Sequence, residues 1–251
     1  ILQVDMQPFW IAVGLLIFSC VVRAYRWQLL LDPVEHIPFH NLFAATMIGY
    51  FGNGVLVFRL GELLKAYSAA QDRVISVSQT FGTVILERIL DLLMVVLIFS
   101  VLIPWFPFEQ DWLRHAMQVF SLTVFLMILF IGLAYKFEWL DVFEDKMFFQ
   151  HGLGEKFLAI GQKVFDGVTI IRKTRHGFSI ALSSILLWGI NYSTTILILA
   201  ACGIDLGWIG AGILFVIGSV AIGIPALPGS VGTYDAGVKY SLVIIFSIAG
   251  N

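Results

Sequence analysis

The sequence NLFAATMIGYFGNGVLVFRLGELLK at residues 41–65 decides the fold, because it is apolar over most of its length and yet broken in the middle. The break is the glycine-rich segment 49–54. It leaves two apolar pieces, each shorter than the ~20 residues that a helix needs to cross a bilayer. We therefore expect residues 40–67 to enter and leave the membrane on the same side, as a re-entrant helical hairpin.

The composition of the whole chain is that of an integral membrane protein. Hydrophobic residues make up 59% of the 251 residues and charged residues 13%, about half the ~25% typical of a soluble domain. The net charge of -2 argues against nucleic acid as a partner. Cys20 and Cys202 lie in apolar runs, so we interpret them as small core residues and not as a disulfide. Because the chain starts at Ile1 and ends next to an apolar run, we expect it to be a fragment trimmed at both ends.

Further apolar segments that span, or nearly span, a bilayer lie on either side of the hairpin. They cover residues 6–22, 92–108, 116–135, 177–204 and 206–234. If Arg23 and Arg26 end the first span at the cytoplasmic face, most other lysines and arginines also fall on that face, as the positive-inside rule expects. This orientation predicts a multi-pass protein of the cell membrane (inner or plasma membrane).

The last apolar segment is broken in the same way as the first hairpin, by prolines and glycines at residues 225–232. In the expected orientation, residues 208–250 form a second re-entrant hairpin, which enters from the outer side. The predicted fold class is therefore all-α: one polytopic transmembrane helix bundle over residues 1–251, with two oppositely oriented re-entrant helical hairpins. Residues 1–135 and 177–251 are its two halves, and such an inverted repeat places the substrate near the midplane.

The charged region between the halves, residues 136–176, is expected to lie in the cytoplasm. Apolar side chains recur there at helical spacing, for example Phe157, Ile160 and Val164, with Glu155 and Lys163 on the opposite face. This pattern fits an amphipathic helix on the membrane surface, and equally an ordinary linker helix packed on the bundle.

Three groups of ionisable residues fall at membrane depth, where a charge costs at least ~2.5 kcal/mol and usually serves a function. The first group follows the break in the first hairpin: Asn53, then Arg59, Glu62 and Lys65 at i, i+3 and i+6 on one helix face. The half-helix that begins here points its positive dipole end into the membrane, and Arg59 beside it is suited to hold a phosphate. The alternative is a structural ion pair that caps the hairpin.

The second group is Glu87, Arg88 and Asp91. It continues a polar stripe that includes Thr80 and Thr83, which indicates a helix face turned toward a cavity or partner helices. A role in binding substrate and a salt bridge between helices are equally compatible with this stripe.

The third group belongs to the tip of the second hairpin. Prolines end one half-helix there, glycines permit close backbone approach, and two charges are spaced to pair at i, i+4. Its members are Pro228, Gly229, Gly232, Tyr234, Asp235 and Lys239. A lone proline kink would be unremarkable in a membrane helix, but this tip combines the kink with charges at the position that matches the first hairpin.

These motifs together resemble the lysylphosphatidylglycerol synthase/flippase-like integral membrane family. The residues that carry the resemblance are Gly52-Asn53 through Arg59-Leu60-Gly61-Glu62, Glu87-Arg88-Ile89-Leu90-Asp91, and Leu227-Pro228-Gly229-Ser230-Val231-Gly232. The resemblance implies a multi-helix membrane domain with re-entrant hairpins, often dimeric, that handles lipids such as aminoacylated phosphatidylglycerol or isoprenoid- or hopanoid-linked lipids. It covers the membrane domain only, without the soluble aminoacyl-transferase domain of the family's synthases. Val57 replaces a usual proline, and Asp235 replaces a usual glutamate.

The leading hypothesis is a flippase-like lipid translocase that moves an anionic or aminoacylated phospholipid, or an isoprenoid-linked lipid, between leaflets. Arg59 and the half-helix N-termini would hold phosphate. Glu62, Asp91 and Asp235 would bind a cationic part of the headgroup or a coupling proton. The alternatives are an intramembrane lipid-modifying transferase and an accessory membrane scaffold for a separate lipid synthase. We assign no catalytic residue, metal site or cofactor, and expect membrane lipids and, from the resemblance, a second copy in a homodimer as partners.

Overall fold

The computed structural model describes residues 4–105, 174–223 and 227–246, with five isolated positions between residues 115 and 126. Within these residues, every regular element is a helix. The predicted span 116–135 and the predicted linker 136–176 therefore fall almost entirely outside the described residues.

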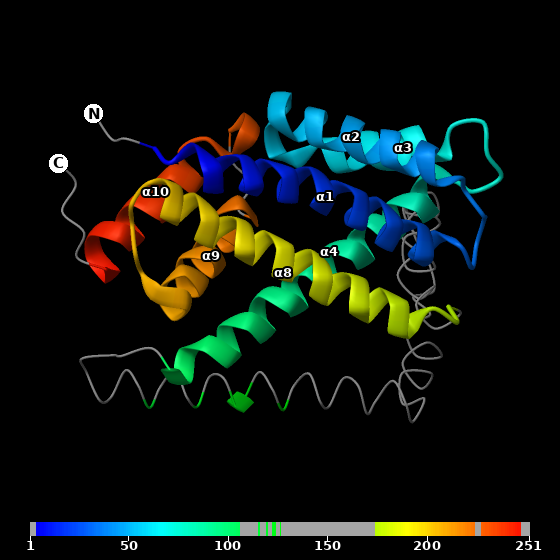
Figure 1. Ribbon diagram of the computed structural model, residues 1–251. Helices are drawn as coiled ribbons and strands as arrows, with labels where there is room; N and C mark the ends of the chain where they lie inside the picture. Colours follow the sequence, from blue (N-terminus) through cyan, green and yellow to red (C-terminus); the bar gives the residue numbers. More distant parts are fainter. Residues whose placement is uncertain are drawn as a thin grey trace, which may run out of the picture.

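Helix α1 (Met6–Leu31) and helix α8 (Gly177–Ala201) pack side by side and run in opposite directions (Figure 1). At one end of the pair, the Asp5 N–H donates to the Ala201 carbonyl at 2.9 Å. At the other end, Asp32 Oδ2 lies 3.4 Å from His176 Nε2. Both helices are long and apolar enough to cross a bilayer.

The first predicted hairpin consists of helix α2 (Phe39–Val55), a short 3-10 turn η1 (Val57–Arg59) and helix α3 (Gly61–Ala70). Glycines hold the two helices in backbone contact. A Cβ added at Gly61 would lie 2.1 Å from the Gly49 carbonyl oxygen and 2.4 Å from the Asn53 nitrogen. Only glycine fits at this crossing. The predicted position of the break is wrong: α2 continues through residues 49–54 to Val55, and the chain turns at residues 56–60. The glycines do not end the helix, because their small size serves the close contact with α3 instead.

Helix α4 (Val77–Leu102), continued by the 3-10 turn η2 (Ile103–Trp105), packs against both members of the α1–α8 pair (Figure 1). Its start is fixed by a capping box, in which Ser76 Oγ accepts from the Gln79 N–H at 3.2 Å and Gln79 accepts from the Ser76 N–H. Helix α4 also contacts α3, so it touches the hairpin as well as the long pair.

The second predicted hairpin begins with helix α9 (Gly207–Gly223) and continues through a 3-10 turn η4 (Pro228–Ser230) into helix α10 (Thr233–Tyr240). A short π-helical turn, η5 (Ser241–Ile245), follows α10. Turn η4 lies against α2 and η1, so the tips of the two hairpins meet.

The backbone of the two tips is alike. In η1, Phe58 and Arg59 have φ values of 55° and 57°, and in η4, Gly229 and Ser230 have φ values of 68° and 57°. Each tip therefore has two successive residues in the left-handed region, in which side chains other than hydrogen are strained. Val57 and Pro228 both begin their turns, so the valine occupies the place that a proline fills in the other tip.

The core of the bundle is apolar, but its outward faces and its buried charges differ from those of a soluble protein. Apolar side chains on the outward faces are open, with Trp10 62%, Ile17 63% and Phe178 81% exposed, whereas Arg26 and Glu87 are fully buried. A water-soluble chain buries apolar residues and leaves arginine and glutamate outside. A lipid solvent favours the opposite arrangement, and the chain is therefore a membrane protein.

The structure corrects the end of the first span. The expected segment ends at Val22, with Arg23 and Arg26 at the cytoplasmic face, but α1 continues to Leu31 and Arg26 is completely buried inside the bundle. The two arginines therefore cannot serve as the flanking charges that set the orientation. The physical reason is that carboxylates on α4 neutralise them, so the helix does not have to end where the charges begin.

Candidate functional site

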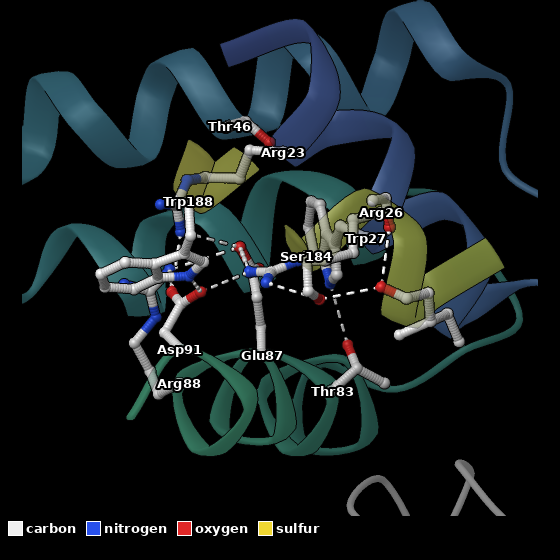
Figure 2. A network of polar contacts seen from close by, with 12 residues as sticks. Arg23, Arg26, Trp27, Thr46, Thr83, Glu87, Arg88, Asp91, Ser184 and Trp188 are labelled. Atoms are coloured by element: carbon white, nitrogen blue, oxygen red, sulfur yellow. Dashed lines mark hydrogen bonds and ion pairs between the residues drawn. The ribbon is translucent and has the colours of Figure 1, made fainter. Parts of the chain in front are cut away.

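A buried cluster of charged side chains lies where α1, α3, α4 and α8 meet. Its centre is the pair Glu87 and Asp91, one turn apart on α4, and both face α1 (Figure 2). Arg23 Nη1 lies 3.2 Å from Glu87 and 2.9 Å from Asp91. Arg26 Nη2 repeats the arrangement, at 3.3 Å from Glu87 and 2.7 Å from Asp91. Each arginine thus bridges both carboxylates, and each carboxylate contacts both arginines.

The first hairpin joins this cluster through Lys65 of α3. Lys65 Nζ lies 2.5 Å from Glu87 Oε2 and 4.1 Å from the ring centroid of Trp27, over its face. The same indole donates through Nε1 to Thr83 Oγ1 at 3.0 Å. Trp27 therefore fixes the lysine by a cation–π contact while a hydrogen bond fixes Trp27 itself. This buried contact joins the hairpin to α1 and α4, next to the apolar core that they share.

Helix α8 closes the cluster with neutral donors and acceptors. Arg26 Nη1 donates to Ser184 Oγ at 3.2 Å, and Trp188 Nε1 donates to Asp91 Oδ1 at 3.3 Å (Figure 2). Both helices of the antiparallel pair thus contribute to one polar network, in which the charges come from α1, α3 and α4.

The cluster continues toward the tip of the first hairpin through Arg88. Its Nη2 lies 3.3 Å from Glu87 and 3.2 Å from Asp91, and its Nε lies 3.8 Å from Glu62. Glu62 in turn lies 3.6 Å from Arg59 Nη2. These ion pairs together form what we call the ionic chain. Its members are Arg23, Arg26, Lys65, Glu87, Asp91, Arg88, Glu62 and Arg59.

The two ends of the ionic chain differ in exposure. The side chains of Arg26 and Glu87 are 0% exposed, Glu62 is 16% exposed, and Arg59 and Arg88 are 29% and 30% exposed. The contacts of Glu62, at 3.6 and 3.8 Å, are also longer than those of Glu87 and Asp91, which are 2.5–3.3 Å. The inner end is thus tightly paired and enclosed, and the outer end is open and loosely paired.

Some donors of the cluster have no hydrogen-bond partner among the residues that the structure describes. The Nε atoms of Arg23, Arg26 and Arg88 are buried and make no hydrogen bond. A buried donor without a partner costs roughly 1–3 kcal/mol. The cluster is therefore assembled with more donors than its carboxylates can satisfy.

Most of the residues predicted for the first two groups come together in this cluster. The structure brings Arg59, Glu62, Lys65, Glu87, Arg88 and Asp91 into one network. The expected i, i+3 pair Arg59–Glu62 forms, whereas Lys65 pairs with Glu87 on α4. Arg88 and Asp91 also form an i, i+3 pair. Asn53 lies at the hairpin crossing, where its Oδ1 is buried without a hydrogen-bond partner.

The third predicted group has a different place. Pro228, Gly229 and Gly232 form the second tip, but Asp235 is exposed and accepts from the Gly232 N–H at 3.2 Å, which caps α10. Lys239 is also exposed, and the expected Asp235–Lys239 pair does not form, because the carboxylate faces its own helix start. Tyr234 packs near Gly218, where an added Cβ would lie 3.1 Å from its ring.

Five members of the cluster were not predicted from the sequence: Arg23, Arg26, Trp27, Ser184 and Trp188. Arg23 and Arg26 were interpreted as flanking charges, and Ser184 and Trp188 gave no reason to be singled out. The spacing of the two arginines is informative, since positions i and i+3 share a helix face. The apolar residues Leu29, Leu30 and Leu31 after them also indicate that the helix continues.

Among the described residues, no group of three or more metal-ligating side chains is placed to hold a metal ion. The charged groups of the cluster are paired with one another. Guanidinium groups bind phosphate and carboxylate through paired hydrogen bonds.

Comparison with known proteins gives one clear result. The model of the family described as lysylphosphatidylglycerol synthase TM region matches residues 1–250. No curated protein and no solved structure matches the chain.

Proposed function

The chain belongs to the lysylphosphatidylglycerol synthase TM region family, and from this premise we propose that it moves an anionic lipid between the leaflets of the cell membrane. The family links the chain to membrane lipids. Translocation, the multi-pass topology and the anionic headgroup are our proposals, supported by the arrangement of the helices and their charges.

We propose that the two hairpins are re-entrant and related as an inverted repeat. Three observations support this relation. Helices α1 and α8 run antiparallel, each is followed by a helical hairpin, and the hairpins approach from opposite ends so that their tips touch. The left-handed residues in both tips fit the same relation. Inverted repeats of this kind place their substrate near the midplane, between broken helices.

The observation that carries the proposal is the difference in side-chain exposure between the two ends of the ionic chain. Arg59 and Arg88 are nearly one-third exposed at its outer end, and Arg26 is enclosed at its inner end. A lipid phosphate would first meet the outer arginines, while its acyl chains stay among the exposed apolar side chains. Because the contacts of Glu62 are long, a phosphate can replace this carboxylate beside both arginines at little cost.

The inner cluster is suited to hold the two halves in register during this movement. Lys65 ties the first hairpin to α4, and Ser184 and Trp188 bring in α8. The transferase alternative would need Glu87 or Asp91 as an acid or base. Both carboxylates are engaged by several cations, an arrangement that suits a fixed negative charge better than proton transfer.

Headgroup accessibility in proteoliposomes tests the proposal. The purified protein is reconstituted with phosphatidylglycerol that carries a headgroup-proximal fluorophore, and a membrane-impermeant quencher reports the outer leaflet over time. We expect Arg59→Gln to slow the movement about tenfold, which corresponds to the loss of one charge-assisted hydrogen bond.

Arg73→Gln is the matched control, because Arg73 lies outside the ionic chain and its contact with Glu35 is 3.9 Å long. It should move lipid at the wild-type rate. The proposal would be refuted if the Arg59→Gln variant moved lipid at the wild-type rate. It would also be refuted if lipid moved no faster with the wild-type protein than in protein-free liposomes.

The orientation with residues 136–176 in the cytoplasm and the association into a homodimer remain further parts of the proposal. Cysteine accessibility from either side of the membrane tests the first. Cross-linking in native membranes tests the second.

A further inference from the structure

The ionic chain is unbalanced in charge. Its carboxylates are Glu62, Glu87 and Asp91, and its cations are Arg23, Arg26, Arg59, Lys65 and Arg88. Among the residues that the structure describes, five cations less three carboxylates leave an excess of two positive charges. No charged residue of α8, α9 or α10 takes part in these contacts, although α8 supplies Ser184 and Trp188.

An excess of this size is costly in a membrane unless a counter-charge joins it. The Nε atom of Arg88, which is buried and has no hydrogen-bond partner among the described residues, gives a second and independent indication that an acceptor is missing at the outer end. The side chain of Arg26 is fully enclosed, so solvent cannot screen the positive charge at the inner end of the ionic chain.

We infer that the outer end of the ionic chain binds a phosphate group with two negative charges, a phosphomonoester or a diphosphate, in preference to a singly charged phosphodiester. This inference rests on the proposed function and names the chemical class of its headgroup. Two charges restore neutrality, whereas one charge leaves the cluster cationic.

The geometry favours the position between Arg59 and Arg88. The only ion pair of Arg59 among the described residues is the 3.6 Å contact with Glu62, and Arg88 reaches the same carboxylate at 3.8 Å. The terminal oxygens of a phosphomonoester can accept hydrogen bonds from both guanidinium groups at once. A phosphodiester has two unesterified oxygens and one charge to share between them.

Binding to the purified full chain in detergent, measured with dioleoyl phosphatidic acid and dioleoyl phosphatidylglycerol, tests the inference. At about pH 8 phosphatidic acid should bind about tenfold tighter, the gain expected from one further charge-assisted hydrogen bond. The advantage should disappear near pH 5, because the second ionisation of a phosphomonoester lies near pH 6. Equal binding at pH 8, or an advantage that persists at pH 5, would overturn the inference.

Two neighbouring substitutions should act in opposite directions. Arg59→Gln lowers the excess to one charge and should bring the ratio of the two affinities close to one. Glu62→Gln raises the excess to three and should strengthen binding of phosphatidic acid. A folding defect would weaken the binding of both lipids alike and leave the ratio of their affinities unchanged. Weaker binding of phosphatidic acid by a folded Glu62→Gln variant would contradict the inference.

Inorganic phosphate as a competitor identifies the source of the group. Displacement of phosphatidic acid by inorganic phosphate supports the inference and points to free phosphate as a ligand in its own right. If inorganic phosphate does not displace phosphatidic acid, the inference is supported and the phosphate group is that of a lipid. Phosphatidic acid binding with the expected pH dependence but no movement of lipid would refute the proposed function alone. Movement of phosphatidylglycerol without a preference for phosphatidic acid would refute this inference alone.

Discussion

Replacing Glu87 by glutamine should destabilise the protein more than the same change at Glu62. Glu87 is fully buried and has four cationic nitrogens within 3.3 Å, from three arginines and one lysine. The substitution removes the charge and retains the size, so those cations lose a shared counter-charge that water cannot replace. Removing one partner from a buried ion pair costs about 3–5 kcal/mol.

This loss corresponds to a fall in Tm of about 6–20 °C, at roughly 2–4 °C per kcal/mol for a chain of this length. Glu62→Gln is the matched control, because its contacts are 3.6 and 3.8 Å long and its side chain is 16% exposed. We expect it to change stability by less than about 1 kcal/mol.

Thermal unfolding in detergent, followed by the fluorescence of the seven tryptophans, measures both variants. Equal Tm values for the two variants would refute the reasoning, because they would show that the inner and outer ends of the ionic chain contribute alike. The same conclusion would follow if Glu87→Gln unfolded at the wild-type temperature.

Three further predictions concern the hairpin and the end of α1. Gly61→Ala should open the first hairpin and lower Tm by an amount equivalent to about 1–3 kcal/mol, because its Cβ would lie 2.1 Å from the Gly49 carbonyl. Gly54→Ala, with nothing within 4 Å of its Cβ, should be neutral, and equal effects of the two changes would contradict the packing. Val57→Pro should raise stability by about 0.4–1 kcal/mol in the same unfolding assay, because Val57 begins η1 as Pro228 begins η4. A lower Tm would show that the two turns are not equivalent at this position. The hydrogen bond from His36 lowers the pKa of Asp32 below its usual value, so its contribution to stability is present above about pH 4 and is lost as the pH falls through the lowered pKa. Unfolding measured across acidic pH should therefore show a shallower loss of stability for Asp32→Asn than for the wild type, and parallel curves would count against the contact.

The first hairpin and the polar face of α4 could be predicted from the sequence because both depend on local spacing. The glycines at 49–54 interrupt an apolar run, and only their small size permits the contact between Gly49 and Gly61. Periodicity likewise places Thr83, Glu87 and Asp91 on one buried face of α4.

The partners of that face could not be predicted, because they come from distant parts of the chain. Arg23 and Arg26 are 64 and 61 residues away from Glu87, and Trp188 is 97 residues away from Asp91. Helical spacing shows which side chains share a face but not which helix lies opposite. Without that knowledge, two arginines at the end of an apolar run were interpreted as a membrane boundary.

The predicted Asp235–Lys239 pair is absent for a local reason. An aspartate in the first turn of a helix can pair with a lysine at i+4 or accept from the free N–H groups at the helix start. The structure has the second contact, with Gly232, and leaves Lys239 outside it. The second tip therefore contributes its backbone to the meeting of the hairpins, and the charged groups of the ionic chain come from the other elements.

A structure of the protein with a bound anionic phospholipid in a lipid nanodisc would show directly where the headgroup binds. We expect phosphate density between Arg59 and Arg88, with phosphate oxygens about 2.7–2.9 Å from guanidinium nitrogens and the acyl chains outside the bundle. Phosphate density at the exposed Lys239, or lipid bound without contact to either arginine, would contradict this expectation.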